Sequence, residues 1–208
     1  MINNECIVQK EYAKYLGIIL DEKLTWKHHI NHVNIKLAKG IGILYRLRNF
    51  VSKEQLRTLY FSFVQPYIDY GLVNWCSAPA HHLKVVKKRI DKAINVISFT
   101  KNTQLSCKKF NILDFENYVK YINGTFLWKI CNGTCPLSFS SEFKRIYRTN
   151  RKGALQLQLP MIKTDYKKRF ITYSGVKIWN EIPYQIREIN ILHKFKTKLR
   201  SHLLHIDP

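Results

Sequence analysis

Three histidines near the N-terminus, His28, His29 and His32, have types and spacing that could bind a metal ion. His28 and His32 are four residues apart, the spacing that places two zinc ligands on one face of a helix in H-E-x-x-H metalloproteases. In those enzymes a glutamate follows the first histidine and acts as general base, whereas here that position is His29. The motif lacks its base, so we expect neither metalloprotease chemistry nor a bound metal here.

The five cysteines offer a second set of possible metal ligands. Cys131 and Cys135 have a loose zinc spacing, but no second Cys or His pair follows at the separation that zinc fingers use. The five cysteines are odd in number and spread along the chain, which is typical of reduced thiols and not of a disulfide framework. We therefore expect buried or surface thiols at positions 6, 76, 107, 131 and 135.

Carboxylates that could hold the two metal ions of a nucleotidyl-transfer enzyme are not grouped in this sequence. The aspartates are scattered, at positions 21, 69, 91, 114, 165 and 207. The one adjacent acidic pair, Asp21-Glu22, is followed by Lys23 and is typical of a turn. We expect no catalytic residue in this chain and no cofactor of its own.

Net charge is the unusual feature of the composition. The 208 residues include 35 Lys and Arg against 14 Asp and Glu, a formal net charge of +21. The excess is uneven, because residues 1–75 contribute +4 and residues 76–208 contribute +17. So strong a charge opposes compaction by self-repulsion, and a polyanionic partner is the simplest explanation. Nucleic acid is the leading candidate.

A membrane surface is the competing polyanion, and the sequence argues against it. No uncharged apolar run approaches the roughly 20 residues that a spanning helix needs. Residues 1–10 are polar and lack the apolar region of a signal peptide. We expect an intracellular protein, nuclear or cytoplasmic, with no membrane partner.

The elements that must position these groups begin with a short strand. Tyr15 to Leu20 is rich in β-formers with Gly17 inside it, which indicates a strand that another backbone or a ligand approaches closely. This strand can pair with residues 6–9 around a connection at 10–14. Because a free hairpin is marginally stable at best, we expect a chain cut from a larger protein, with the rest of the sheet upstream. The alternative is a small edge ribbon packed on helices.

A long helix is predicted next. Thr25 has the side chain of an N-cap, and apolar residues recur at spacings of three and four from Trp26 to Leu44. Gly40 and Gly42 each weaken such a helix by roughly 1 kcal/mol relative to alanine, unless a neighbouring helix packs close to them. We therefore expect close packing at both glycines.

Caps and periodicity predict the later helices. Ser52 and Gln55 have capping-box spacing, and Pro66 should end or kink the helix that starts there. Asp114 can cap another helix, which Asn123-Gly124 should interrupt. The remaining patterns predict a helix over 83–97, a strand over 155–159 and a last helix over 192–203.

Two basic segments are the candidate nucleic-acid contacts. The outer face of the predicted helix over 83–97 is a helix face of the kind that follows phosphates, and it carries Lys84, Lys87, Lys88 and Lys92. In an average protein such a face is only a solvated surface, but the net charge favours contact. The second segment spans residues 144–152 and has a tyrosine between its charges; its candidates are Arg145, Arg148 and Arg151.

Three blocks of residues resemble one protein family. The blocks are Lys14 to Asp21 with Leu24-Thr25-Trp26; Leu59-Tyr60, Gln65 to Ile68 and Tyr70-Gly71 with Trp75; and Trp179 to Pro183 with Phe195-Lys196 and Leu199. They are similar to the end of the palm and the following region in reverse transcriptases of jockey-like, LINE-type non-LTR retrotransposons. The resemblance runs from about Lys14 to Leu204.

The resemblance implies a mainly α fold, a helical thumb-like bundle with a short N-terminal β-hairpin and a small mixed α/β C-terminal region. Residues 1–25 would be a remnant of the palm with a primer-grip-like hairpin at Tyr15-Leu16-Gly17. Residues 26–100 would form the thumb-like bundle and 101–208 a basic C-terminal region. The family's Asp-Asp pair, with its two Mg ions, belongs to the palm upstream. The resemblance therefore implies a non-catalytic part of an RNA-directed DNA polymerase.

The implied partners are RNA and DNA, in the form of an RNA–DNA duplex held by its backbones. The missing palm and fingers region of the same polyprotein would be a further partner. An alternative is a freestanding basic nucleic-acid-binding or interaction module derived from such an element. A third interpretation is a degenerate reading frame whose product has no role.

Overall fold

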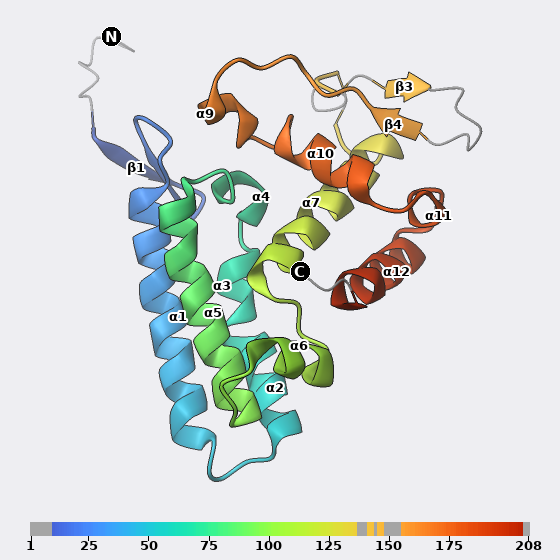
Figure 1. Cartoon of the computed structure of the whole chain (residues 1–208). Helices are drawn as coiled ribbons and strands as arrows, with labels where there is room; N and C mark the ends of the chain where they lie inside the picture. Colours follow the sequence, from blue (N-terminus) through green and yellow to red (C-terminus); the bar gives the residue numbers. More distant parts are fainter. Residues whose placement is uncertain (1–9, 137–140, 144, 148–154, 206–208) are drawn as a thin grey trace.

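The fold is mainly helical, as the sequence predicts. The computed structural model describes residues 10–136, 141–143, 145–147 and 155–205. Helices dominate this part of the chain, and two short antiparallel strand pairs accompany them (Figure 1). None of the described helices is both long and apolar enough to cross a membrane.

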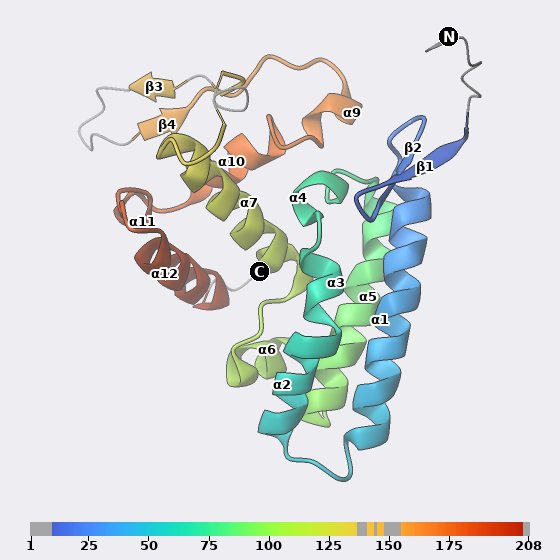
Figure 2. The same ribbon diagram turned by 180° about the vertical axis from the view of Figure 1, so that it is seen from behind.

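The N-terminal half of the described chain is a helical bundle. Two long helices, α1 and α5, lie side by side along one flank, and α2 and α3 pack beside them (Figures 1 and 2). The side chains of Leu37, Leu44, Leu56 and Val86 are fully buried between these helices. The bounds are α1 Lys27–Leu47, α2 Lys53–Phe63, α3 Gln65–Asp69, α4 Leu72–Trp75, α5 Ala80–Ser98 and α6 Thr103–Phe110.

The predicted start and end of α2 are confirmed. The Ser52 side chain accepts a hydrogen bond from the Gln55 N–H, and the Gln55 side chain accepts one from the Ser52 N–H. At the other end α2 stops at Phe63, and Pro66 lies in the first turn of α3. Proline has no N–H to donate and clashes with the preceding turn, which is why the helical path is broken here.

The N-terminal hairpin forms, but its register differs from the prediction. Strand β1 (Tyr12–Tyr15) pairs with β2 (Ile18–Asp21), and Leu16-Gly17 is the turn between them. Both turn residues have positive φ, 45° and 83°, which a two-residue hairpin turn of type I′ requires. The prediction of Gly17 inside a strand and of a connection at 10–14 was therefore wrong. The predicted partner strand, residues 6–9, lies outside the described residues.

The entry to α1 is organised by Asp21, at the end of β2. Its two carboxylate oxygens accept hydrogen bonds from the N–H groups of Thr25 and Trp26, at 2.8 Å and 2.7 Å. Burial raises the pKa of Asp21, but these hydrogen bonds outweigh it and hold the pKa below its ordinary value. The predicted N-cap, Thr25, was wrong, because Trp26 occupies the cap position in a left-handed conformation.

The two glycines of α1 have different surroundings. A Cβ on Gly40 would lie 2.5 Å from the backbone oxygen of Phe63, so α1 and α2 approach as closely as predicted. A Cβ on Gly42 would meet nothing within 4 Å. The prediction of close packing is confirmed at Gly40 and wrong at Gly42, which faces open space.

A second core surrounds α7 (Phe115–Cys131). Asp114 caps this helix, as predicted, by accepting hydrogen bonds from the N–H groups of Glu116 and Asn117. The predicted interruption at Asn123-Gly124 was wrong, because the helix runs through it without a break. A Cβ on Gly124 would lie 2.9 Å from the Ile182 side chain, so this glycine allows close packing within the helix.

The C-terminal elements are a mixture of helices and strands, of which α10 and α12 pack on α7. Trp179, Phe195 and Leu199, from the third block of the resemblance, are almost fully buried here. The predicted strand over 155–159 is shorter, and the Asn180 side chain hydrogen-bonds the Leu157 backbone at 3.1 Å and 2.9 Å. The bounds are β3 Arg145–Tyr147, β4 Leu155–Leu157, α9 Asp165–Lys168, α10 Ser174–Glu181, α11 Tyr184–Arg187 and α12 Leu192–His205.

Candidate nucleic-acid interface

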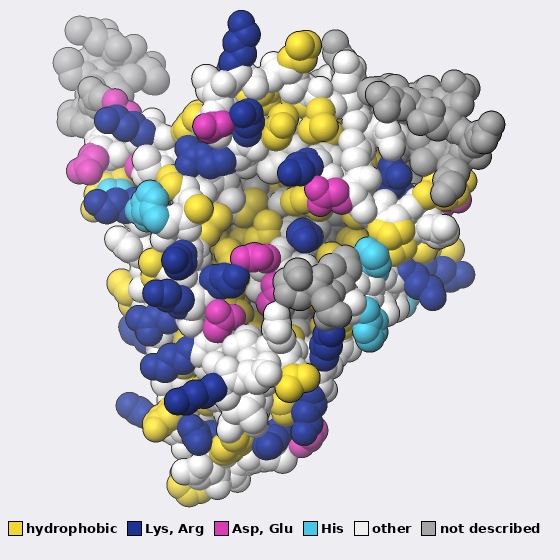
Figure 3. Space-filling model, in the orientation of Figure 1, with side chains coloured by type: hydrophobic (Ala, Val, Ile, Leu, Met, Phe, Trp, Pro, Cys, Tyr) yellow, Lys and Arg dark blue, Asp and Glu magenta, His cyan; other side chains and the backbone are white. Residues whose placement is uncertain are grey.

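Three of the four lysines predicted on α5 share one exposed stripe. Lys84, Lys88 and Lys92 are exposed and recur every four residues, so they lie along one side of the helix. Lys and Arg side chains gather along the flank that α1 and α5 form (Figure 3). We call these three residues the lysine stripe.

The fourth lysine, Lys87, is turned away from the stripe. Its Nζ forms an ion pair and hydrogen bond with Glu116 at the start of α7. That hydrogen bond raises the pKa of Lys87 above its ordinary value. Burial raises the pKa of the neighbouring Asp91, while the charge of Lys87 lowers it. Lys87 therefore takes part in a local charge network between α5 and α7.

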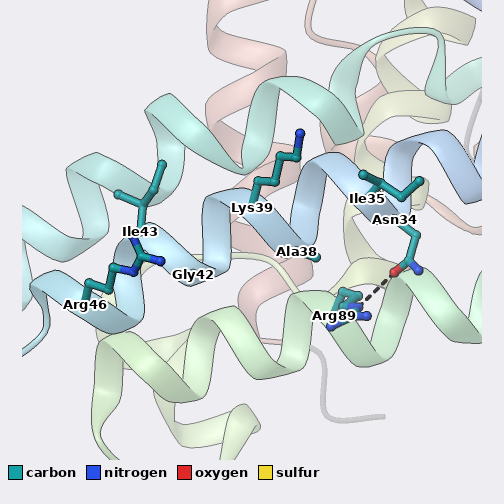
Figure 4. Close-up of a pocket in the computed structure, with 8 residues that line it drawn as sticks. All are labelled: Asn34, Ile35, Ala38, Lys39, Gly42, Ile43, Arg46 and Arg89. Carbon is teal, nitrogen blue, oxygen red and sulfur yellow. Dashed lines mark hydrogen bonds between the residues drawn. The ribbon is translucent and has the colours of Figure 1, made fainter.

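A groove of about 570 Å³ runs between α1 and α5 beside the stripe (Figure 4). Three of its lining residues are basic and none is acidic, so the groove carries a net positive charge that attracts anions. The lining consists of Asn34, Ile35, Ala38, Lys39, Gly42, Ile43, Arg46 and Arg89. We call it the basic groove.

Small residues and helix geometry explain the shape of the basic groove. Ala38 and Gly42 lie one turn apart on α1, and their lack of bulk leaves the hollow. Lys39 and Arg46 are exposed and two turns apart on the same helix, so they flank it from one side. Arg89 lies opposite them on α5 (Figure 4). Cations thus face the groove from both helices.

Arg89 is fixed in place by a hydrogen bond. Its Nε donates to Oδ1 of Asn34 on α1, at 2.8 Å. The bond uses one guanidinium nitrogen, and the two terminal nitrogens can still donate to an anion. A guanidinium held in this way is pre-oriented and loses less side-chain freedom when it binds a phosphate.

The primer-grip-like residues lie at the tip of the hairpin. The side chains of Tyr15 and Leu16 are 66% and 73% exposed. The Leu16 carbonyl accepts a hydrogen bond from the Tyr70 hydroxyl, and a Cβ on Gly17 would lie 3.2 Å from the Tyr70 ring. Two blocks of the resemblance therefore contact each other. The tip stands beyond the N-terminal end of α1, about two helical turns before the basic groove begins at Asn34.

The second predicted basic segment is not placed at this surface. Arg145 is in β3, and its side chain lies outside the described residues. Arg148 and Arg151 also lie outside the described residues. None of the predicted contact residues is among those that line the basic groove, and the described candidates Lys84, Lys88 and Lys92 lie beside it on α5.

Sequence reasoning missed the contribution of α1 to this surface. Lys39 and Arg46 were not singled out, and Gly42 was interpreted as a packing position. A signal was present, because small and basic residues alternate on the outer side of α1 at positions 38, 39, 42 and 46. Arg89 lies opposite this side of α1 only because of the way α1 and α5 pack, which the sequence does not show.

The N-terminal histidines contact the hairpin. The His28 ring stacks on Tyr12 with centroids 4.6 Å apart. Nδ1 of the buried His29 accepts a hydrogen bond from the Ile19 N–H at 3.3 Å, and burial lowers the pKa of His29. Within the described ranges no three His, Cys, Asp or Glu residues are grouped as a metal site.

Comparison with known proteins gives one curated relative. The chain is 30% identical over 106 residues to the "Probable RNA-directed DNA polymerase from transposon X-element" of Drosophila melanogaster. The match covers 48% of this chain and 12% of that protein. It supports a relationship to retrotransposon reverse transcriptases. No protein-family model matches the chain, and no solved structure matches it significantly.

Proposed function

We propose that this chain is a non-catalytic part of a retrotransposon RNA-directed DNA polymerase that binds the template–primer duplex by its phosphates. The observation that carries the proposal is the basic groove between α1 and α5, which has basic residues on both sides and no acidic residue in its lining. The lysine stripe extends the same charge along the outer side of α5. Similarity to a retrotransposon polymerase favours nucleic acid over other polyanions.

The length of the surface suits a run of phosphates. From Asn34 to Arg46 the helix advances about 18 Å at 1.5 Å per residue. At about 3.4 Å per nucleotide of one strand, this length matches about five phosphates. The groove and stripe together supply six cations, which is enough to neutralise most of that run: Lys39, Arg46, Lys84, Lys88, Arg89 and Lys92.

The chemistry of the surface favours backbone contacts over base recognition. Base edges are read mainly by bidentate side chains such as Asn, Gln and Arg placed inside a groove of the nucleic acid. The one amide in the basic groove, Asn34, already accepts a hydrogen bond from Arg89. Lysines on a helix face supply charge without a fixed geometry. We therefore infer sequence-independent binding.

The division of the chain follows from the same proposal. Residues 1–25 would be the end of the palm, 26–100 the thumb-like bundle and 101–208 a basic C-terminal region. The hairpin tip at Tyr15-Leu16-Gly17 would face the primer end when the palm is attached. The palm and fingers region of the polyprotein would then supply the carboxylates and two Mg ions.

Charge neutralisation at matched positions tests the proposal. One variant replaces the exposed residues Lys39, Arg46, Lys88 and Lys92 by Gln. A control removes the same charge elsewhere, by replacing the exposed residues Lys163, Lys167, Lys194 and Lys198 by Gln. Binding of an RNA–DNA duplex is measured by fluorescence anisotropy, and folding by circular dichroism.

We expect the first variant to bind on the order of 10-fold to 100-fold more weakly than the unmodified chain, because phosphate contacts are lost. The control should change affinity by no more than about twofold. Equal losses in both variants would show that net charge alone attracts the duplex, and the assignment of the basic groove would fail.

A freestanding module is the second candidate. It is favoured by the buried core around α1, α2 and α5, which includes fully buried residues from each helix. Such a module should be soluble and unfold cooperatively as residues 1–208. Aggregation of the isolated chain, with solubility restored by an added upstream segment, would favour the polymerase part.

A further inference from the structure

Three aromatic side chains are exposed at the end of the bundle where α1 meets α2 and α5 ends. Tyr45 in the last turns of α1 is 59% exposed, Phe50 in the α1–α2 connection is 83% exposed and Phe99 after α5 is 41% exposed. We call them the aromatic tip. Folding normally buries rings, since each carries a large apolar area. Their joint exposure next to a basic groove calls for an explanation beyond the fold.

The backbone conformation of Phe99 is a second unusual feature of the aromatic tip. Phe99 ends α5 in a left-handed conformation with φ of 60°, a position that glycine usually occupies. A residue with a side chain is strained there, by about 1–2 kcal/mol. The described structure nevertheless places a large ring at this position. The strained position of Phe99 is therefore a reason to look for a functional role of its side chain.

Cations surround these rings. The Arg48 guanidinium lies over the rings of Tyr45 and Phe99, with its central carbon 5.2 Å and 4.7 Å from their centroids. Nζ of Lys53 lies 5.2 Å from the Phe99 centroid. Nε of Arg48 is buried and has no hydrogen-bond partner within the described chain. Rings and cations thus form one mixed surface.

A second hollow of about 440 Å³ opens beside Phe99. Its cationic lining residues come from α5, from the C-cap of α1 and from the segment after α5, and only Asp91 in the lining is acidic. These cations are Arg48, Lys88, Lys92 and Lys101. Lys88 and Lys92 also belong to the lysine stripe. The aromatic tip is therefore continuous with the surface that we assign to the duplex.

Interleaved rings and cations fit single-stranded nucleic acid. Bases without a pairing partner stack on aromatic side chains in a sequence-tolerant way, while Lys and Arg hold the intervening phosphates. Paired bases within a duplex do not offer a free face to such rings. A purely apolar protein partner would leave the surrounding cations desolvated and unpaired.

We propose that the aromatic tip binds unpaired nucleotides of a single strand that extends beyond the duplex on the basic groove. The inference rests on the proposed function and names a further feature of its substrate, a duplex with a single-stranded extension. A base would stack on Phe99 or Tyr45, and Arg48 and Lys101 would contact the phosphates on either side. The basic groove ends at Arg46 and the tip begins at Tyr45, so a strand leaving the groove meets the rings directly.

The experiment compares blunt and extended duplexes. An RNA–DNA duplex is used blunt, with a six-nucleotide RNA extension or with a six-nucleotide DNA extension. Affinity is measured by fluorescence anisotropy for the unmodified chain and for Tyr45→Leu/Phe99→Leu, which keeps apolar bulk and removes the two rings that Arg48 contacts. Tyr166→Leu is the control, because Tyr166 is also exposed and has Arg169 over its ring, 5.2 Å from the centroid, but lies away from the tip.

We expect at least one extended duplex to bind the unmodified chain about tenfold more tightly than the blunt duplex. The double variant should lose this preference and keep its affinity for the blunt duplex. The Tyr166→Leu variant should keep both the preference for extended duplexes and the affinity for the blunt duplex. Phe99→Gly removes the ring and relieves the backbone strain, and urea unfolding shows whether the variant remains as stable as the unmodified chain. A loss of preference with unchanged stability is then due to the missing ring.

Three results would overturn the inference. If the unmodified chain binds blunt and extended duplexes equally, the tip has no single-strand role, while the proposed duplex binding stands. If none of the three duplexes binds, the proposed function and the inference both fail. If the rings mediate self-association in sedimentation and give no preference for extensions, the tip is an interface between copies of the chain.

Discussion

Nε of Arg89 on α5 donates a 2.8 Å hydrogen bond to Oδ1 of Asn34 on α1, and this bond spans the basic groove. It orients a charge without altering it. Asn34→Ala should therefore weaken duplex binding a few-fold and leave its salt dependence unchanged. Arg89→Gln removes a phosphate contact and should make the slope of log K against log salt less steep by about 0.9. Both values come from anisotropy titrations at several salt concentrations. An unchanged slope for Arg89→Gln would exclude Arg89 from the phosphate contacts.

Lys87 and Lys88 are adjacent in sequence but have different surroundings, and they form a matched pair. Lys87 is bonded to Glu116, whereas Lys88 is exposed in the lysine stripe. Lys88→Gln should reduce duplex affinity by about threefold to tenfold, as expected for one lost phosphate contact. Lys87→Gln should have less than half of this effect, measured as free energy of binding. Equal effects would indicate a diffuse attraction to the net charge.

Gly40 and Gly42 of α1 should respond to alanine in opposite directions. At Gly40 the added Cβ would lie 2.5 Å from the Phe63 oxygen, so Gly40→Ala should destabilise the fold by about 1–3 kcal/mol. At Gly42 the space is open, and Gly42→Ala should stabilise the fold by about 0.5–1 kcal/mol. Urea unfolding measures both. Destabilisation by Gly42→Ala would contradict the open geometry of the groove.

His29 should make stability fall in mildly acidic solution. Burial, with a smaller effect of His32, lowers its pKa from 6.5, and its unprotonated Nδ1 accepts the Ile19 N–H. Below about pH 6.5 the His29 side chain binds a proton in the unfolded chain but not in the folded chain. The contribution of His29 to the free energy of unfolding is therefore complete above this pH and is lost as the pH falls. Urea unfolding from about pH 7 to about pH 5 follows the change.

The control for this prediction is His29→Asn, which keeps a hydrogen-bond acceptor but does not titrate. Burial also lowers the pKa of His82 and His202, so the variant should retain part of the pH dependence. A pH profile identical to that of the unmodified chain would show that His29 does not contribute.

Local patterns in the sequence predicted the helices well. The apolar stripe of α1, the capping box of α2 and the Asp114 cap each depend on residues within a few positions of one another. The hairpin register was not predictable in the same way, because Gly17 fits both a strand and a turn. The helix α6, capped by Asn102, was not predicted because its apolar positions are too few to show a period.

The interface could be predicted only in part. The lysine stripe follows from helical spacing, but the partner of Lys87 is 29 residues away and leaves no local signal. The basic groove depends on Gly42 facing open space and on Arg89 meeting Asn34, which only the packing of α1 against α5 determines. Residues that line a surface shared by two helices are therefore the ones that sequence reasoning missed.

The most direct test of the central claim is the salt dependence of binding between the unmodified chain and an RNA–DNA duplex. With about five phosphate contacts, log K should fall linearly with log salt, with a slope of about −4 to −5. Affinity should then drop by about 10²-fold to 10³-fold between about 50 mM and about 200 mM salt. An affinity that stays constant over this range would contradict binding through the phosphate backbone.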